Sequence, residues 1–364
     1  MTKKLDVGGQ AVIEGVMMRG PDSMVIAVRS PDGSIVVKDD KWVPIVKRFP
    51  ILKLPLIRGA VVLLESMVNG MQALSFSASI AMDEEAEQAA REVEAAGGTA
   101  EEADAAREKA KPNETLTSGA IAVSLVSAFA LGAGLFIYLP HASATAIVNL
   151  LNGLPITTEA PVASPAFHGL VGFIKMLVFV SYILLIRRMP DIKRVFQYHG
   201  AEHKSIHAYE AGQELTIENA RAWPTFHPRC GTSFLVFVIL ISIFFFAGVF
   251  PLVPFPPDLA GWKLNALQAS IKLPLMIPIA GLSYEVIKFA GKLDKGSKVM
   301  RWISWPGWLM QQLTTIEPDD DQLEVALTSL KRALEHEGAL EPTYDNVRFL
   351  APEPNVAAAV AVEV

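Results

Sequence analysis

The sequence predicts a mainly α-helical, polytopic membrane protein with about four transmembrane helices and a small N-terminal β-hairpin element. Of its 364 residues, 51% are hydrophobic and only 19% are charged. The apolar residues are concentrated in long runs, and a helix needs about 20 of them to cross a bilayer. Four runs reach that length, at 118–139, 166–187, 232–254 and 266–288.

The N-terminal unit, residues 1–53, contains the predicted hairpin. Two runs rich in β-branched residues, at 25–28 and 35–37, flank a Ser-Pro-Asp-Gly sequence that is typical of a tight turn. The Gly-rich segment before it, residues 8–21, permits tight backbone paths and close approach to a partner group. We expect no signal peptide, because the first ten residues lack an apolar core.

Two segments of different character precede the first span. Residues 54–82 are apolar but interrupted by polar side chains, and we interpret them as an amphipathic or re-entrant helix in the membrane plane. Residues 83–115 are rich in Ala, Glu, Lys and Arg, which predicts an acidic insert, either helical or disordered. We assign this insert no catalytic role.

The membrane domain, residues 116–290, has an asymmetric distribution of basic residues. Lys and Arg follow the second and fourth spans, whereas residues 139–166 contain neither. The positive-inside rule therefore places a His-rich loop, 188–231, and both termini in the cytosol. We expect a multi-pass protein of the cell inner (cytoplasmic) membrane, with the lipid bilayer as its first partner.

The C-terminal region, residues 291–351, is predicted to be cytosolic. It contains a charged amphipathic helix at 320–337, with leucines on one side. We interpret His336 on this helix as a solvated surface group. The tail, residues 352–364, is predicted to be disordered.

Three histidines recur at intervals of four in the His-rich loop. Pro190 predicts the start of a helix and Gly212 its end. His199, His203 and His207 then share one face of that helix. His199 and His207 are about 12 Å apart along the axis, so an unbroken helix cannot bring all three to one ion.

The first two histidines enclose an acid in the order His-x-x-Glu-His. In proteins with this order the two histidines bind zinc and the glutamate polarises water. We therefore predict His199 and His203 as metal ligands and Glu202 as the catalytic base. The alternative is that Glu202 holds a ligand in place or acts as a capping group.

Two more ligands of the types that zinc prefers lie at the start of the third span. They are His227 and Cys230, in Phe-His-Pro-Arg-Cys-Gly. We expect His227 to converge on His199 and His203, with His207 in its place only if the helix bends. Cys230 is a weaker candidate, because a single cysteine is more often a small buried hydrophobe.

Three other residues are further candidates for the site. Glu14 offers an oxygen ligand, and Arg19 lies in the same Gly-rich segment. Glu285, with Arg58 and Glu65, is more typical of a polar network within the membrane than of a catalytic site.

Four motifs together resemble the bacterial domain of unknown function 1385 family. They are Gly8–Arg19, Tyr198–Lys204, His227–Ser233 and Pro306–Leu309, the last continuing to Pro318. The resemblance extends over nearly the whole chain except the acidic insert and the tail. It implies a predicted metal-dependent membrane enzyme, and it supplies no reaction or substrate.

Two functions fit these observations. The first is a hydrolase with a divalent metal ion of the zinc type at the cytosolic membrane face, acting on an unidentified peptide or lipid-linked substrate. The second is a non-catalytic membrane metal-binding or assembly scaffold. A metal carrier fits poorly, because Ser242 is the only polar side chain between 234 and 250. No long basic stretch with interleaved aromatic residues appears, so we expect no nucleic-acid partner.

Overall fold

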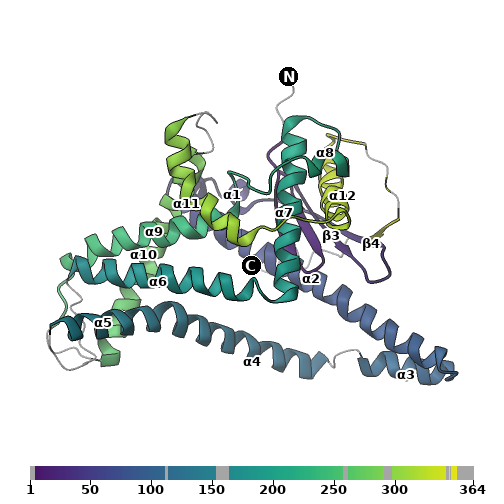
Figure 1. Cartoon of the computed structure of the whole chain (residues 1–364), viewed down its shortest axis with the longest axis horizontal. Coiled ribbons are helices and arrows are strands. Elements are labelled where there is room, and N and C mark those ends of the chain that lie inside the picture. The colour runs from purple at the N-terminus through teal and green to yellow at the C-terminus, as the bar shows by residue number, and fades with distance from the viewer. Residues whose placement is uncertain are drawn as a thin grey trace.

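The computed structural model combines long apolar helices with a head that is built around a β-sheet (Figure 1). The predicted tail 352–364 lies outside the described residues, as do residues 153–163 between the first two spans. The described residues are 5–110, 114–152, 164–256, 261–290, 297–341, 344 and 346–350.

The sheet of the head has five strands in the order β1-β2-β3-β4-β5. The predicted hairpin is confirmed as β3 and β4, which pair from Ser23–Lys41 to Arg29–Ile35. The Gly-rich segment, for which no strand was expected, adds β1 and β2 to this antiparallel meander. A last strand from the C-terminal region pairs in parallel with β4. The strands are β1 (Gly8–Val12), β2 (Gly15–Arg19), β3 (Ser23–Arg29), β4 (Ile35–Lys41) and β5 (Val347–Leu350).

Helices cover both faces of the sheet, which explains why its strands are apolar on both sides. Successive residues of a strand point to opposite faces. Met18 and its neighbours on one face pack with α7 (Pro190–Ala211) and α12 (Asp320–His336), whereas Met17 and its neighbours pack with α2 (Ile57–Ala95). Residues of β1 therefore lie directly against the helix that carries the histidines.

Helix α2 joins two segments that the sequence separated. It runs without a break from the predicted membrane-plane helix into the acidic insert, so the two predicted segments share one helix. Helix α3 (Ala100–Ala110) folds back on it, and Arg107 pairs with Glu87 at 2.8 Å. The described part of the insert is thus a helical hairpin, which suits its Ala- and Glu-rich composition. The placement of 54–82 in the membrane plane stays a prediction.

In the part of the chain that the structure describes, four helices are long and apolar enough to cross a membrane, as expected of a membrane protein. Three candidate spans agree closely with prediction: Pro165–Ile186, Gly231–Leu252 and Leu267–Phe289. The first, Val126–Leu151, lies further along the chain than the predicted 118–139. The helix continues past residue 139, where the predicted span ended, and a π-helical turn over residues 134–138 precedes Pro140.

The remaining elements complete both parts of the fold. In Figure 1 the candidate spans 126–151, 165–186 and 231–252 run roughly side by side, the span 267–289 crosses them, and the head lies at one end. These remaining elements are α1 (Ile45–Arg48), η1 (Pro50–Lys53), α4 (Glu114–Ala133), η2 (Gly134–Tyr138), α5 (Leu139–Leu151), α6 (Pro165–Ile186), α8 (Ile217–Arg221), α9 (Gly231–Val249), η3 (Phe250–Leu252), α10 (Gly261–Ala290) and α11 (Lys298–Thr314).

Helix α12 confirms the predicted amphipathic helix and ties the C-terminal region to the head. It begins with a capping box between Asp319 and Gln322. His336 at its end was expected to be solvated, but its Nε2 lies 2.6 Å from Oδ2 of the buried Asp39. Arg332 binds the same carboxylate. A buried acid needs such partners, so His336 has a structural role.

Helix α11 exposes a row of tryptophans. Trp302, Trp305 and Trp308 are 82%, 58% and 40% exposed. Tryptophan is enriched at the boundary between lipid and water, because its ring is apolar and its N–H is polar. The C-terminal end of α11, in contrast, is buried and reaches the histidines of α7.

Candidate metal centre

Helix α7 carries the histidines, and both of its predicted ends are confirmed. Pro190 occupies the first turn, where its missing N–H costs nothing. Gly212 caps the C-terminus with φ of 73°, a left-handed conformation that favours glycine. One side of the helix packs on the sheet and α12. The histidine side faces the loop before α9 and the end of α11.

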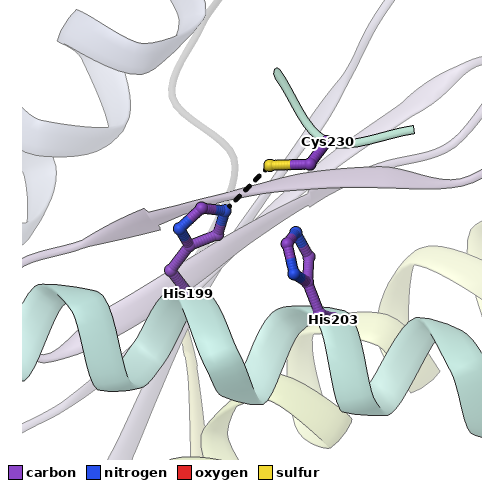
Figure 2. A group of neighbouring side chains, drawn as sticks. All are labelled: His199, His203 and Cys230. Carbon is purple, nitrogen blue, oxygen red and sulfur yellow. Dashed lines mark hydrogen bonds between the residues drawn. The ribbon is translucent and has the colours of Figure 1, made fainter. Parts of the chain in front are cut away.

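Two histidines and the cysteine converge in the first of two groups of potential ligands (Figure 2). The nitrogen and sulfur atoms of His199, His203 and Cys230 all lie within 4.8 Å of one another. His199 Nε2 is 3.2 Å from Cys230 Sγ, and the two imidazole rings are 4.5 Å apart. Imidazole and thiolate are donors that suit zinc.

Backbone carbonyls orient both rings of this group. Nδ1 of His199 donates to the carbonyl of Thr314 at 2.9 Å, and Nδ1 of His203 donates to that of Thr225. Each ring therefore turns Nε2 toward the cysteine. His203 is 1% exposed, and its Nε2 has no hydrogen-bond partner among the described residues. Histidines that bind metal are held by their second nitrogen in this way.

Cys230 sits at the N-cap of α9, where unpaired backbone N–H groups favour a negative charge. Burial opposes ionisation of its thiol, but His199 and His203 outweigh burial and hold the pKa of Cys230 well below its usual range. Burial also disfavours the charged ring of His199, whereas Cys230 raises the pKa of that ring to about 9. The sulfur is therefore ready to act as a thiolate ligand.

Glu202 lies beside this group and against strand β1. Its side chain is buried, and it accepts a hydrogen bond from the backbone of Gly9. A Cβ at Gly9 would lie 2.8 Å from Cγ and Cδ of Glu202, so only glycine fits there. Oε2 of Glu202 has no partner among the described residues. Burial raises the pKa of Glu202, and the nearby His199 and His203 oppose that rise.

The second group of potential ligands is one helical turn further along α7. It consists of His207, Glu210 and His227, whose ligand atoms also lie within 4.8 Å of one another. His227 was expected to join His199 and His203, and this is wrong, because Cys230 occupies that place. A turn with a 3.3 Å hydrogen bond from Cys230 N to the carbonyl of His227 directs the two side chains to different groups.

Fixed partners hold each member of the second group. His207 Nε2 donates to the carbonyl of Phe226 at 2.7 Å, and its ring stacks on Trp223. Burial lowers the pKa of His207 to about 4. Burial would raise the pKa of Glu210, but His227, 3.4 Å away, outweighs burial and lowers it to about 2. The carboxylate is therefore ionised at neutral pH.

Gln311 of α11 is a positioning residue that sequence reasoning missed. Its side chain accepts from the backbone N–H of His227 at 2.9 Å and donates to the His227 carbonyl at 3.0 Å. It also donates to the hydroxyl of Ser233 on α9. The sequence pointed to this part of α11 only because the motif that runs from Pro306 to Pro318 resembles one of the family's motifs. No spacing rule identifies a glutamine 84 residues from its partner.

Three further candidates lie outside both groups. Glu14 pairs with Arg194 and accepts a hydrogen bond from the hydroxyl of Tyr198 at 3.3 Å. Arg19 lies on the α2 face of the sheet, over the ring of Trp42. Glu14 therefore anchors the β1–β2 turn to α7, and neither residue belongs to either group of potential ligands among the described residues.

Glu285 is engaged within the membrane part. Its Oε1 accepts from Nε of Arg58 at 2.5 Å, so these two residues form the predicted polar pair. Glu65 does not join them, because it accepts a hydrogen bond from the backbone of Ile45.

Comparison with known proteins finds two matches. Residues 54–336 match the family model described as protein of unknown function (DUF1385). The uncharacterized protein YqhQ of Bacillus subtilis (strain 168) is 32% identical over 342 residues, which cover 92% of this chain and 94% of that protein. No solved structure matches the chain. The family match begins after β4, so the motif Gly8–Arg19 lies outside it.

Proposed function

The chain belongs to the DUF1385 family, and on that premise we propose that it is a metal-dependent membrane hydrolase with its site in the group His199, His203 and Cys230. Glu202 is the base of this proposed reaction. The substrate is a peptide or lipid-linked molecule that the site meets at the cytosolic face of the inner (cytoplasmic) membrane.

The buried Nε2 of His203 is the observation that carries the proposal. A buried polar atom without a partner costs free energy, and this one points at a thiol and a second imidazole. A divalent cation of the zinc type satisfies all three donors. When bound, such an ion supplies Lewis acidity and makes water a nucleophile near neutral pH.

Glu202 has the properties of a general base. Burial raises its pKa, which makes the carboxylate a stronger proton acceptor. The contact with Gly9 fixes its side chain, and Oε2 is left without a partner among the described residues. Glu202 lies between the two histidines in sequence. It is therefore adjacent to the proposed metal ligands and is not itself one of them.

The surroundings of the site support a substrate that is held at the membrane. The helix that supplies Thr314 and Gln311 to the site also carries the three exposed tryptophans, so the site and a lipid-facing surface share one rigid element. A small, largely apolar pocket lies beside the loop 226–230. It is lined by Phe226, Pro228, Ser233, Phe237, Ile287 and Ser304.

The depth of the site favours a second candidate, a metal-binding scaffold. Glu202, His203 and Cys230 are all at least 94% buried, as in structural metal sites that no substrate enters. A scaffold needs the ion and the fold but has no use for a base. The two candidates therefore differ in what they require of Glu202.

Replacement of Glu202 by glutamine separates the two functions, because the amide keeps the shape but cannot accept a proton. The full chain is purified in detergent, and its metal content and hydrolysis of model peptides and acyl esters are measured for native protein, Glu202→Gln and His203→Ala. A hydrolase loses activity in both variants but loses metal only in His203→Ala. The scaffold is supported if the native protein contains metal and the native protein and Glu202→Gln show the same hydrolysis. No metal in the native protein rejects both.

A further inference from the structure

We infer that His207, Glu210 and His227 form a second divalent-cation site, which adjoins the first and makes a paired metal centre. The donors are two imidazoles and a carboxylate, a set that takes zinc, iron(II) or manganese(II). Occupancy of this site stands on its own geometry, whereas the pairing also rests on the function proposed above.

The three donor side chains are already arranged around one point. His207 gives its Nε2 proton to the Phe226 carbonyl, so Nδ1 is the nitrogen that is able to bind a cation. Stacking on Trp223, with ring planes 15° apart, fixes the ring. His227 is 3% exposed, and its buried Nε2 has no hydrogen bond among the described residues. That nitrogen faces the Glu210 carboxylate, 3.4 Å away, which is too far for a good hydrogen bond.

The neighbours of the group support ligation. Arg229 binds the Glu210 carboxylate and thereby holds it in place, as outer partners of ligating carboxylates do. The backbone N–H of Arg229 lies 3.3 Å from Nδ1 of His227. A cation at Nε2 requires the proton on Nδ1, and moving the proton there breaks only this long hydrogen bond. Gln311 meanwhile keeps the backbone of His227 fixed from both sides.

The two groups are direct neighbours. The rings of His203 and His227 are 5.6 Å apart, and those of His207 and His227 are 4.6 Å apart. A soft site with a thiolate therefore adjoins a harder site with a carboxylate. Paired metal sites in proteins act on phosphate esters and on scissile amides, because two ions together stabilise the charge that develops in the reaction.

Cobalt(II) distinguishes the two sites, because only a site with a thiolate ligand gives a sulfur-to-cobalt charge-transfer band. The full chain is purified in detergent, stripped with a chelator and titrated with cobalt(II), and bound metal is counted. Native protein should bind two ions per chain and show the band. His207→Gln, which can still donate to the Phe226 carbonyl, should bind one ion and keep the band. Cys230→Ser should bind one ion and lose it.

Each alternative outcome bears on a different claim. If native protein binds one cobalt ion and shows the charge-transfer band, and His207→Gln does the same, the second site is rejected and the first is kept. One ion without the band, lost in His207→Gln, supports the second site and rejects the first. Failure to bind cobalt rejects both. Glu210→Gln provides a second variant, and gel filtration with helix content by circular dichroism identifies any variant that does not fold.

Discussion

The side chain of Glu202 packs directly on the backbone of Gly9, although the two residues lie 193 positions apart in the chain. This contact joins the Gly-rich motif of β1 to the His-x-x-Glu-His motif of α7. It explains why the second residue of β1 is a glycine.

Substitution of Gly9 by alanine should displace Glu202, because the new methyl group would lie 2.8 Å from its Cγ and 2.9 Å from the Met17 carbonyl oxygen. Overpacking of this kind costs about 1–3 kcal/mol. Denaturant unfolding in detergent measures the loss. Gly8→Ala is the matched control, since nothing lies within 4 Å of a Cβ there. Equal stability of the two variants would contradict the contact.

Removal of the Gln311 side chain should loosen His227. Gln311→Ala leaves the buried backbone N–H of His227 without its partner, which costs roughly 1–3 kcal/mol, whereas the His227 carbonyl keeps the hydrogen bond from Cys230 N. The free energy of unfolding should fall by that amount, and cation binding should weaken at the second group. Gln312→Ala, at the exposed neighbouring position, is the control and should change neither.

The stability of the metal-free chain should decrease in mild acid. Burial lowers the pKa of His207 from 6.5 to about 4, so between these values the unfolded chain binds a proton that the folded chain does not. The free energy of unfolding should therefore fall as the pH drops through this window, by about 1–3 kcal/mol. Denaturation curves in chelator at several pH values check this. His207→Gln should flatten the dependence, and an unchanged slope would argue against it.

The His-rich loop and both termini should face the cytosol. A cysteine at the exposed Lys193 of α7 should react with a membrane-impermeant reagent from the cytosolic side only. A cysteine at Thr157, which lies outside the described residues, should react from the opposite side. Labelling of both positions from one side would overturn the four-span topology.

Local patterns in the sequence determined the class of protein and the element that carries the site. Apolar runs of bilayer length predicted four spans, since a helix in lipid must satisfy its own backbone. Pro190 and Gly212 predicted both ends of α7, because each residue acts on the backbone where it stands. The four-residue interval then placed the histidines on one face without reference to any other part of the chain.

Tertiary structure alone decided which residues meet on that face. His227 and Cys230 are three residues apart, and only the path of their loop directs the cysteine to His199 and the histidine to His207. Thr314 and Gly9 approach α7 from distant segments, and Gln311 holds the backbone of His227 from a third. These contacts come from packing of α7 between the sheet and α11, and packing leaves no short-range periodicity from which they could be predicted.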